Sequence, residues 1–158
     1  EIHECFKNIV GVQMRNMATI GGSVFARFGF SDVLTFLLPL DTYVVLYNGG
    51  IISIADFVNK PYEKDLLTHI IIKKTPVKIK YLSVRNTATD FPILTCCVIN
   101  KNGKITAAVG GRPMKAQLIA EEQFEKLPLS FGSNMRASAE YRHHLAKVLL
   151  KRGTEAVK

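Results

Sequence analysis

The spacing of apolar residues changes twice in the first quarter of the chain, and each change predicts a different element. Residues 1–10 carry apolar side chains at the one-face spacing of an amphipathic helix, which Gly11 is expected to end. Residues 18–30 fit neither the helical nor the strand period, so an irregular segment with turns is expected there. The pair Ser31-Asp32 then offers N-cap chemistry, which predicts a helix through residues 33–40.

The middle of the chain has short β-branched and aromatic runs separated by turn residues. A run at 42–48, the pair Gly49-Gly50 and a run at 51–54 form the pattern of a β-hairpin. The pair Asn102-Gly103 predicts a second hairpin between strands 92–100 and 105–110. The other elements expected in this part are a helical turn at 55–59 and strands at 66–74 and 77–85.

After Gly110-Gly111 the strand pattern gives way to helix-forming residues. Residues 115–126 are good helix formers, and a longer amphipathic helix is expected from about residue 134 to residue 156. Strands followed by terminal helices predict an α+β fold. We place a boundary that divides the chain into modules 1–76 and 77–158, each of which is small for independent stability.

Composition narrows the class of protein without identifying it. The chain is 47% hydrophobic and 22% charged, which is typical of a globular protein, and no apolar run approaches the roughly 18–20 residues that span a bilayer. The net charge of +8 is uneven, because residues 100–158 hold 11 Lys or Arg against 5 Asp or Glu. A basic C-terminal part can meet nucleic acid, an anionic cofactor or an acidic partner, or simply form a solvated helix face.

The three cysteines do not form a disulfide framework. An odd count without secretory context indicates reduced thiols in a cytoplasmic protein. Cys5 belongs to the apolar face of the first helix, whereas Cys96 and Cys97 point to opposite faces of a strand, so we expect one core and one surface residue. Nothing in the sequence has the ligand spacing of a zinc or iron–sulfur site.

The stretch 19–23 is the segment with the most chemical content. Two glycines flanked by hydroxyl residues form a turn in which backbone N–H groups can approach an anion closely, and Asp32 can accept a hydrogen bond from a ribose hydroxyl. The residue types alone leave two alternatives open, since a Gly-Gly turn is often only a turn and Asp32 is often only a helix cap. The stretch is neither a dinucleotide-binding GxGxxG fingerprint nor a P-loop.

A family resemblance adds to this interpretation. The run Arg15-Asn16-Met17-Ala18-Thr19-Ile20-Gly21-Gly22-Ser23, with Ser31-Asp32 after it, resembles the second FAD motif of the molybdenum hydroxylase flavoproteins. That family includes xanthine dehydrogenase, aldehyde oxidase, carbon monoxide dehydrogenase and nicotinate dehydrogenase. Residues 107–116, Glu121-Glu122 and residues 136–149 resemble the family's C-terminal domain. Ser23 replaces the usual Asn, and Gly29 stands where Pro is common.

The resemblance implies an FAD site built on the motif. Leu66 and Leu67 resemble the segment that packs near the isoalloxazine, although ordinary core packing is an equal alternative for them. The cofactor-binding residues that the resemblance implies are Ala18, Thr19, Ile20, Gly21, Gly22, Ser23, Phe25, Ser31, Asp32, Leu66 and Leu67.

The resemblance also implies a fold and a role. Residues 1–76 correspond to part of the second FAD-binding subdomain, an antiparallel sheet with helices, and residues 77–158 to a C-terminal domain of a three-stranded antiparallel sheet plus helices. The Gly-Gly-Thr phosphate segment of the family's N-terminal subdomain does not occur, so we expect this chain alone to bind FAD weakly or not at all, and to be inactive in isolation. The implied role is an oxidoreductase flavoprotein subunit that relays electrons from iron–sulfur clusters through FAD to NAD or another acceptor. The implied partners are a molybdenum-binding large subunit and an iron–sulfur small subunit, and no residue here is nominated as catalytic.

Two rival functions compete with the flavin interpretation. The first is a basic nucleic-acid- or protein-binding module. The last predicted helix carries five cations, namely Arg136, Arg142, Lys147, Lys151 and Arg152. The strands lack an aromatic RNA-stacking motif and the helix lacks a groove-reading pattern, so we expect no nucleic-acid partner and no membrane. The second rival is a non-flavin structural subunit of the same family. His143 and His144 are adjacent on a helix and are expected to be surface residues, not metal ligands.

Overall fold

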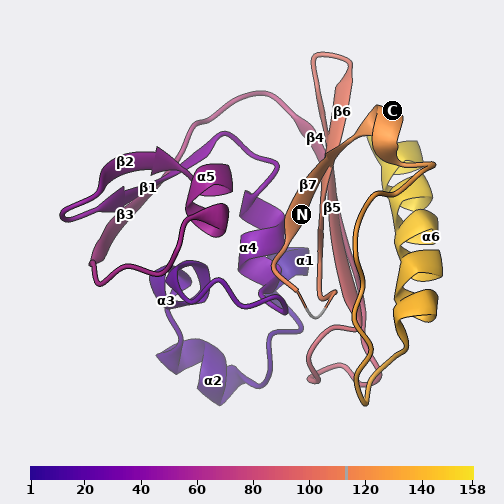
Figure 1. Cartoon of the computed structure of the whole chain (residues 1–158), viewed down its shortest axis with the longest axis horizontal. Coiled ribbons are helices and arrows are strands. Elements are labelled where there is room, and N and C mark those ends of the chain that lie inside the picture. The colour runs from indigo at the N-terminus through magenta and orange to yellow at the C-terminus, as the bar shows by residue number, and fades with distance from the viewer. Residues whose placement is uncertain (113) are drawn as a thin grey trace.

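The computed structural model describes residues 1–112 and 114–158, and it has two parts that pack side by side (Figure 1). One part holds short helices and a small antiparallel sheet, and the other is a larger antiparallel sheet covered on one face by a long C-terminal helix. This is the α+β fold that the sequence predicts. Pro113, which belongs to a segment that carries the family resemblance, lies outside the described residues.

The N-terminal segment forms four short helices where fewer were expected. They are α1 (Ile2–Phe6), α2 (Val12–Met17), α3 (Ile20–Phe25) and α4 (Asp32–Leu37). The first helix ends at Phe6, and Gly11 is the N-cap of α2, so the expectation that Gly11 ends the first helix was wrong. The expected Gly-Gly turn is also wrong, because the Thr19 hydroxyl accepts a hydrogen bond from the Gly22 N–H (2.9 Å) and thereby caps α3. Ser31 caps α4 in the same way, as expected.

The smaller sheet has the strand order β2-β1-β3. Its strands are β1 (Thr42–Leu46), β2 (Gly50–Ser53) and β3 (Leu67–Ile72), and the hairpin expected around Gly49-Gly50 joins β1 to β2. Helix α5 (Ile54–Asn59) follows directly, with Ser53 as its N-cap. Phe57 and Val58 of α5 are buried in the core beneath this sheet, together with Val44 of β1.

The larger sheet has four strands in the order β4-β5-β6-β7. They are β4 (Lys78–Val84), β5 (Leu94–Lys101), β6 (Lys104–Gly110) and β7 (Gln117–Ala120), and a 3-10 turn, η1 (Glu121–Gln123), follows. The helix expected over 115–126 and the three-stranded sheet were therefore wrong. Residues 117–120 pair with the edge of β6, from Val109↔Gln117 to Thr106↔Ala120. These ladder hydrogen bonds outweigh a local helix propensity worth only a few tenths of a kcal/mol per residue.

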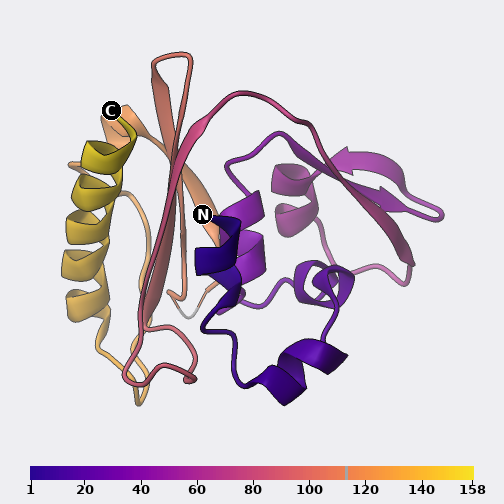
Figure 2. The same ribbon diagram turned by 180° about the vertical axis from the view of Figure 1, so that it is seen from behind.

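Helix α6 (Ala139–Val157) covers one face of this sheet, as both views show (Figures 1 and 2). It begins five residues later than the expected start at residue 134, because Ser138 is its N-cap and accepts a hydrogen bond from Tyr141 N. Gly153 lies against the sheet, since a Cβ there would lie 3.1 Å from the Cβ of Val98 and closer still to a methyl of that side chain. The helix and the strand are thus closely packed at this point.

Strand β5 lies between two hydrophobic cores. Cys97 belongs to the core that includes α4 and the smaller sheet, whereas Cys96 belongs to the core beneath α6. The expectation that one of these cysteines is a surface residue was wrong, because both faces of the sheet are covered. A buried hydrogen bond between the hydroxyls of Thr35 on α4 and Thr95 on β5 (2.9 Å) joins the two parts of the molecule.

Within the described residues no helix combines the length and the apolar character needed to cross a bilayer.

Candidate functional site

A cavity of about 380 Å³ lies between α2, α3 and the segment before α4 on one side, and the loop after β4 on the other. Its walls are mostly apolar, with a few polar groups that converge on it, which is the usual make-up of a small-molecule site. The lining residues that carry the argument are Ala18, Thr19, Gly22, Ser23, Asp32 and Arg85.

The structure divides the sequence-predicted site residues into two groups. Six of the eleven lie on the cavity wall, and they are Ala18, Thr19, Gly22, Ser23, Ser31 and Asp32. The other five do not line it, and they are Ile20, Gly21, Phe25, Leu66 and Leu67. The cavity wall thus includes Gly22 and the polar residues of the motif, whereas Gly21 lies outside it.

Gly22 is the position at which the absence of a side chain matters most. A Cβ at Gly22 would lie 3.0 Å from Thr19 Oγ1, which is the atom that caps α3. The hydroxyl accepts the Gly22 N–H and keeps its own proton to donate. The motif thus presents a hydroxyl and a bare stretch of backbone to the cavity, which a ligand can approach closely.

The second surface lies on the opposite side of α3. Leu67, the first residue of β3, faces Gly21, since a Cβ at Gly21 would meet Leu67 Cδ2 at 3.7 Å. Leu66 and Ile20 are both more than half exposed, so an apolar surface continues outward from this contact. Phe25 is different, because its ring packs on Phe57 at 6.0 Å between centroids and belongs to the core.

Three aromatic rings that were not identified from the sequence form one end of the cavity. Phe28 stacks on Phe30 at 5.0 Å between centroids, and Phe30 packs against Phe91 at 4.3 Å. All three rings are 40–55% exposed. Exposed aromatic faces that line a cavity are suited to stacking on a planar ring. The only local signal was the pair of Phe residues flanking Gly29, because Phe91 comes from the distant loop after β4.

Asp32 lies at the base of the cavity and is not a free carboxylate. The Tyr81 hydroxyl donates a hydrogen bond to Asp32 Oδ1 at 2.6 Å, and Arg85 forms an ion pair with the same oxygen. The side chains of Arg85 and Asp32 are each 6% exposed. Burial, and then the charge of Asp32, raise the pKa of Tyr81 well above its usual range, so the phenol stays neutral and remains a donor.

The loop after β4 is tied to the segment before α6. The Arg136 guanidinium donates to both carboxylate oxygens of Asp90, with Nη2 2.7 Å from Oδ1, and lies over the Phe91 ring at 5.2 Å. This hydrogen bonding holds the pKa of Asp90 below its usual value.

The basic stripe expected around the last helix is only partly present. Arg142 is buried and donates to the carbonyl of Ile93 at 2.7 Å, and also to the carbonyl of Gly111, so it is an internal cross-link. Arg136 is paired with Asp90, which leaves Lys147, Lys151 and Arg152 as exposed cations of the stripe. The nucleic-acid alternative therefore loses two of its five cations.

The histidines have structural or surface positions. His143 packs edge-on against Phe131 at 5.6 Å between centroids, and His144 is exposed. No group of three or more His, Cys, Asp or Glu suited to a metal occurs in the part of the chain that the structure describes.

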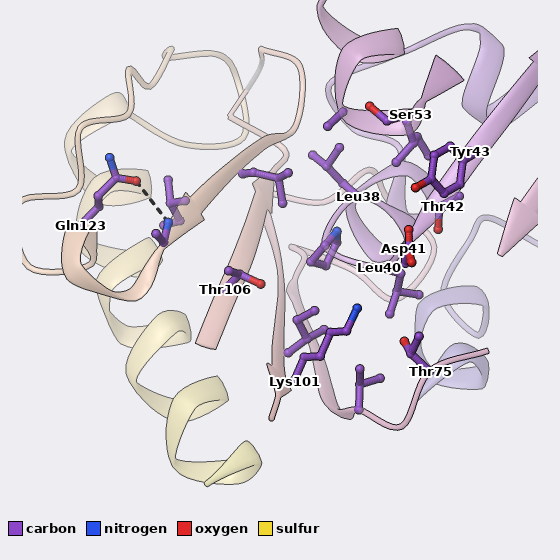
Figure 3. Close-up of a pocket in the computed structure, with 18 residues that line it drawn as sticks. Leu38, Leu40, Asp41, Thr42, Tyr43, Ser53, Thr75, Lys101, Thr106 and Gln123 are labelled. Carbon is purple, nitrogen blue, oxygen red and sulfur yellow. Dashed lines mark hydrogen bonds between the residues drawn. The ribbon is translucent and has the colours of Figure 1, made fainter. Parts of the chain in front are cut away.

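A second, open cleft of about 520 Å³ lies between two walls (Figure 3). One wall is the end of α4 with β1, and the other is formed by residues of β5, β6 and β7 of the larger sheet. Its polar side chains come from opposite walls, with Asp41 and Tyr43 on one side and Lys101 and Thr106 on the other. None of the motif residues lines this cleft. The chemistry predicted from the motif is therefore confined to the smaller cavity and to the surface beside α3.

The arrangement of helices and sheets recurs in solved structures of oxidoreductases. The chain of quinoline 2-oxidoreductase from Pseudomonas putida 86 superposes with a TM-score of 0.80 at 16% identity, covering 98% of this chain and 65% of that one. Carbon monoxide dehydrogenase from Hydrogenophaga pseudoflava gives a TM-score of 0.79 at 18% identity, with the same coverage. The enzyme from Oligotropha carboxidovorans gives 0.80 at 20% identity, over 94% of this chain and 64% of that one. At identities of 16–20% these similarities show only that the chain shares its fold with part of each of these proteins.

Sequence comparison finds a family match in the N-terminal half of the chain. Residues 1–77 match the model of the FAD binding domain in molybdopterin dehydrogenase. This match is limited to the first 77 residues, and it confirms the resemblance seen in the motif. The protein YgfM of Escherichia coli K12 is 40% identical over 161 residues, which cover 94% of this chain and 62% of YgfM. The protein of the same name in Escherichia coli O157:H7 gives the same values, so the chain spans less than two thirds of the length of these relatives.

Proposed function

We propose that this chain supplies one wall of the FAD site of a molybdenum hydroxylase flavoprotein. The observation that carries the proposal is the cavity beside α3, because six residues of the family motif line it together with three exposed aromatic rings. In this assignment residues 1–76 are part of the second FAD-binding subdomain and residues 77–158 are the C-terminal domain.

The residues of the cavity fit the adenosine half of FAD. Its volume of about 380 Å³ is within the usual range for small-molecule sites. The Phe28, Phe30 and Phe91 rings offer stacking faces for adenine, and Asp32 offers an acceptor for a sugar hydroxyl. Thr19 and Ser23 offer hydroxyl donors for the pyrophosphate beside the bare backbone at Gly22.

The isoalloxazine then has its place on the other side of α3. Ile20, Leu66 and Leu67, next to Gly21, provide an apolar wall without competing polar groups. Bound there, the flavin would accept and donate electrons, which is chemistry that the cofactor supplies. The chain binds and orients FAD, excludes water from one side of it, and contributes no acid, base or nucleophile to the reaction.

The role that follows is electron relay within a larger assembly. A molybdenum-binding large subunit and an iron–sulfur small subunit are the proposed partners, and NAD or another acceptor is the proposed electron sink. The relay has the same form whether the assembly is of the xanthine dehydrogenase or the carbon monoxide dehydrogenase type, so the substrate belongs to the molybdenum subunit. Three buried thiols are in keeping with a reducing, cytoplasmic compartment.

Flavin binding is the direct test of this function. The protein, expressed at the full length of its gene, is expected to copurify with FAD or to take it up in a titration followed by flavin fluorescence. A protein that remains colourless and leaves the fluorescence of added FAD unchanged would refute the proposal.

Replacing Gly22 by Val tests whether the motif forms the site. The new side chain would displace the Thr19 hydroxyl and occupy the cavity wall, so we expect FAD affinity to fall by about tenfold or more. The urea midpoint of unfolding, measured on the same preparation, separates loss of binding from loss of folding. Unchanged affinity in a folded variant would contradict the role assigned to Gly22.

A further inference from the structure

The carboxylate of Asp32 is held by groups from the other half of the chain. Asp32 begins α4, whereas Tyr81 lies on β4 and Arg85 directly follows that strand. Both reach Asp32 in a buried position, through a hydrogen bond of 2.6 Å from Tyr81 and an ion pair from Arg85. The sequence separations of 49 and 53 residues are the reason that no local pattern indicates this cluster.

The two contacts share one carboxylate oxygen. Tyr81 and Arg85 both bind Oδ1, and among the described residues no donor reaches Oδ2. A carboxylate can accept about four hydrogen bonds over its two oxygens. Because Asp32 lines the cavity, the second oxygen is left to a ligand there.

Arg85 is itself fixed in place. Its Nη1 donates to the carbonyl of Asp90 at 2.7 Å, so the planar guanidinium bridges α4 and the loop that carries Phe91. Arg136 holds the Asp90 carboxylate, which anchors that loop a second time. Because Arg136 anchors this loop independently, the loss of Arg85 is expected to act mainly on the Asp32 carboxylate.

We propose that Arg85 is a positioning residue of the flavin site, which acts through Asp32 and is supported by Tyr81. The inference rests on the proposed function, and the ligand group it addresses is a sugar hydroxyl of FAD. With Arg85 in place, the Asp32 carboxylate is held through Oδ1 and turns Oδ2 to the cavity. Without it, a buried carboxylate loses its cation and its orientation, and hydrogen bonding to the hydroxyl weakens.

The test compares FAD affinity across a small set of variants, measured by fluorescence titration of the protein at the full length of its gene. Arg85→Met is expected to weaken binding by about tenfold or more, and Asp32→Asn by a similar factor. The double variant is expected to bind about as tightly as Asp32→Asn alone, since Arg85 acts through that carboxylate. Arg85→Lys keeps the positive charge but loses the planar guanidinium with its separate N–H donors, so it is expected to recover part of the affinity.

Tyr81→Phe keeps the shape of the ring and removes only the donor, so it is the variant to use if Arg85→Met does not fold. It is expected to weaken FAD binding several-fold. Tyr43→Phe is its matched control, because the Tyr43 hydroxyl contacts Lys73 outside the cavity and its loss should leave the affinity unchanged. Urea unfolding of each variant without FAD reports the structural effect separately.

The outcomes distinguish the two proposals. If the unmodified protein does not bind FAD, the proposed function and this inference both fail. If it binds FAD and the folded Arg85→Met and Tyr81→Phe variants bind equally well, only the inference is overturned. An equal loss from Arg85→Met in the presence and absence of the Asp32 carboxylate would also overturn it, because Arg85 would then act independently.

Discussion

Gly153 offers a sharp test of the packing between α6 and the larger sheet. It is a buried glycine inside a 19-residue helix, where glycine costs roughly 0.5–1 kcal/mol relative to alanine. On helix propensity alone, Gly153→Ala should stabilise the protein. The structure predicts the opposite, because the new Cβ would lie 3.1 Å from Val98 Cβ and overlap a methyl of the same side chain.

The steric effect should be the larger of the two. Val98 is fully buried on β5, which is paired on both sides, and a β-branched side chain has little rotamer freedom there. Adding a methyl to such a core costs about 1–3 kcal/mol. After subtracting the gain in propensity, we expect Gly153→Ala to lower the free energy of unfolding by about 1–2 kcal/mol.

The matched control is the same substitution in a Val98→Ala background. Shortening Val98 removes the methyl that the new side chain would overlap and leaves only the 3.1 Å contact with Cβ, so there Gly153→Ala should change the free energy of unfolding little. Urea denaturation followed by circular dichroism measures all four proteins. This account of the packing would be refuted if Gly153→Ala alone were at least as stable as the parent. It would also be refuted if Gly153→Ala were equally destabilising in both backgrounds.

Two further predictions follow from the ionisable groups. The pKa of Asp90 is lowered from 3.8 by its hydrogen bonds with Arg136, so the interaction stabilises the fold above that pH and is lost as pH falls below it. The difference in unfolding free energy between the parent and Asp90→Asn should be constant above about pH 5 and shrink below pH 3.8, and a pH-independent difference would contradict the ion pair. Burial raises the pKa of all three thiols, that of Cys96 to about 12, so alkylation at neutral pH should be slow in the native protein and rapid for all three in urea. Rapid labelling of the native protein would show that the cores are open.

The parts of the fold that depend on local chemistry were predicted well. The Gly49-Gly50 and Asn102-Gly103 turns indicate their hairpins because glycine or asparagine is needed at the backbone angles of such turns, and Asn102 and Gly103 do have positive φ. The helix after Ser31 was found because its cap is adjacent in sequence. Strand β7 was missed because its stability comes from pairing with β6 and not from its own residues.

The wrong expectation for the cysteines and the cavity residues that the sequence did not reveal have the same origin. The expected surface position for Cys96 or Cys97 assumed a sheet with one exposed face, and no local feature reveals that both faces are covered. Six of the predicted site residues line a cavity, but its aromatic end and the contacts that hold Asp32 depend on Phe91, Tyr81 and Arg85. Those residues reach the motif only through the packing of β4 and its following loop against the N-terminal helices.

The hydrogen bond between Thr35 and Thr95 has a bearing on how the molecule can be divided. It joins α4 to β5 next to Gly110. The two hydroxyls leave no room for a side chain at that glycine, since a Cβ there would lie 2.6 Å from Thr95 Oγ1. The match to the family ends at residue 77, but a cut there would strip α4 of the sheet that buries it and expose Phe36 and Leu37 to water. Folding should accordingly be a single cooperative transition, and a ligand that tightens the cavity should protect backbone amides in β5 from hydrogen exchange as well as those in α3 and α4.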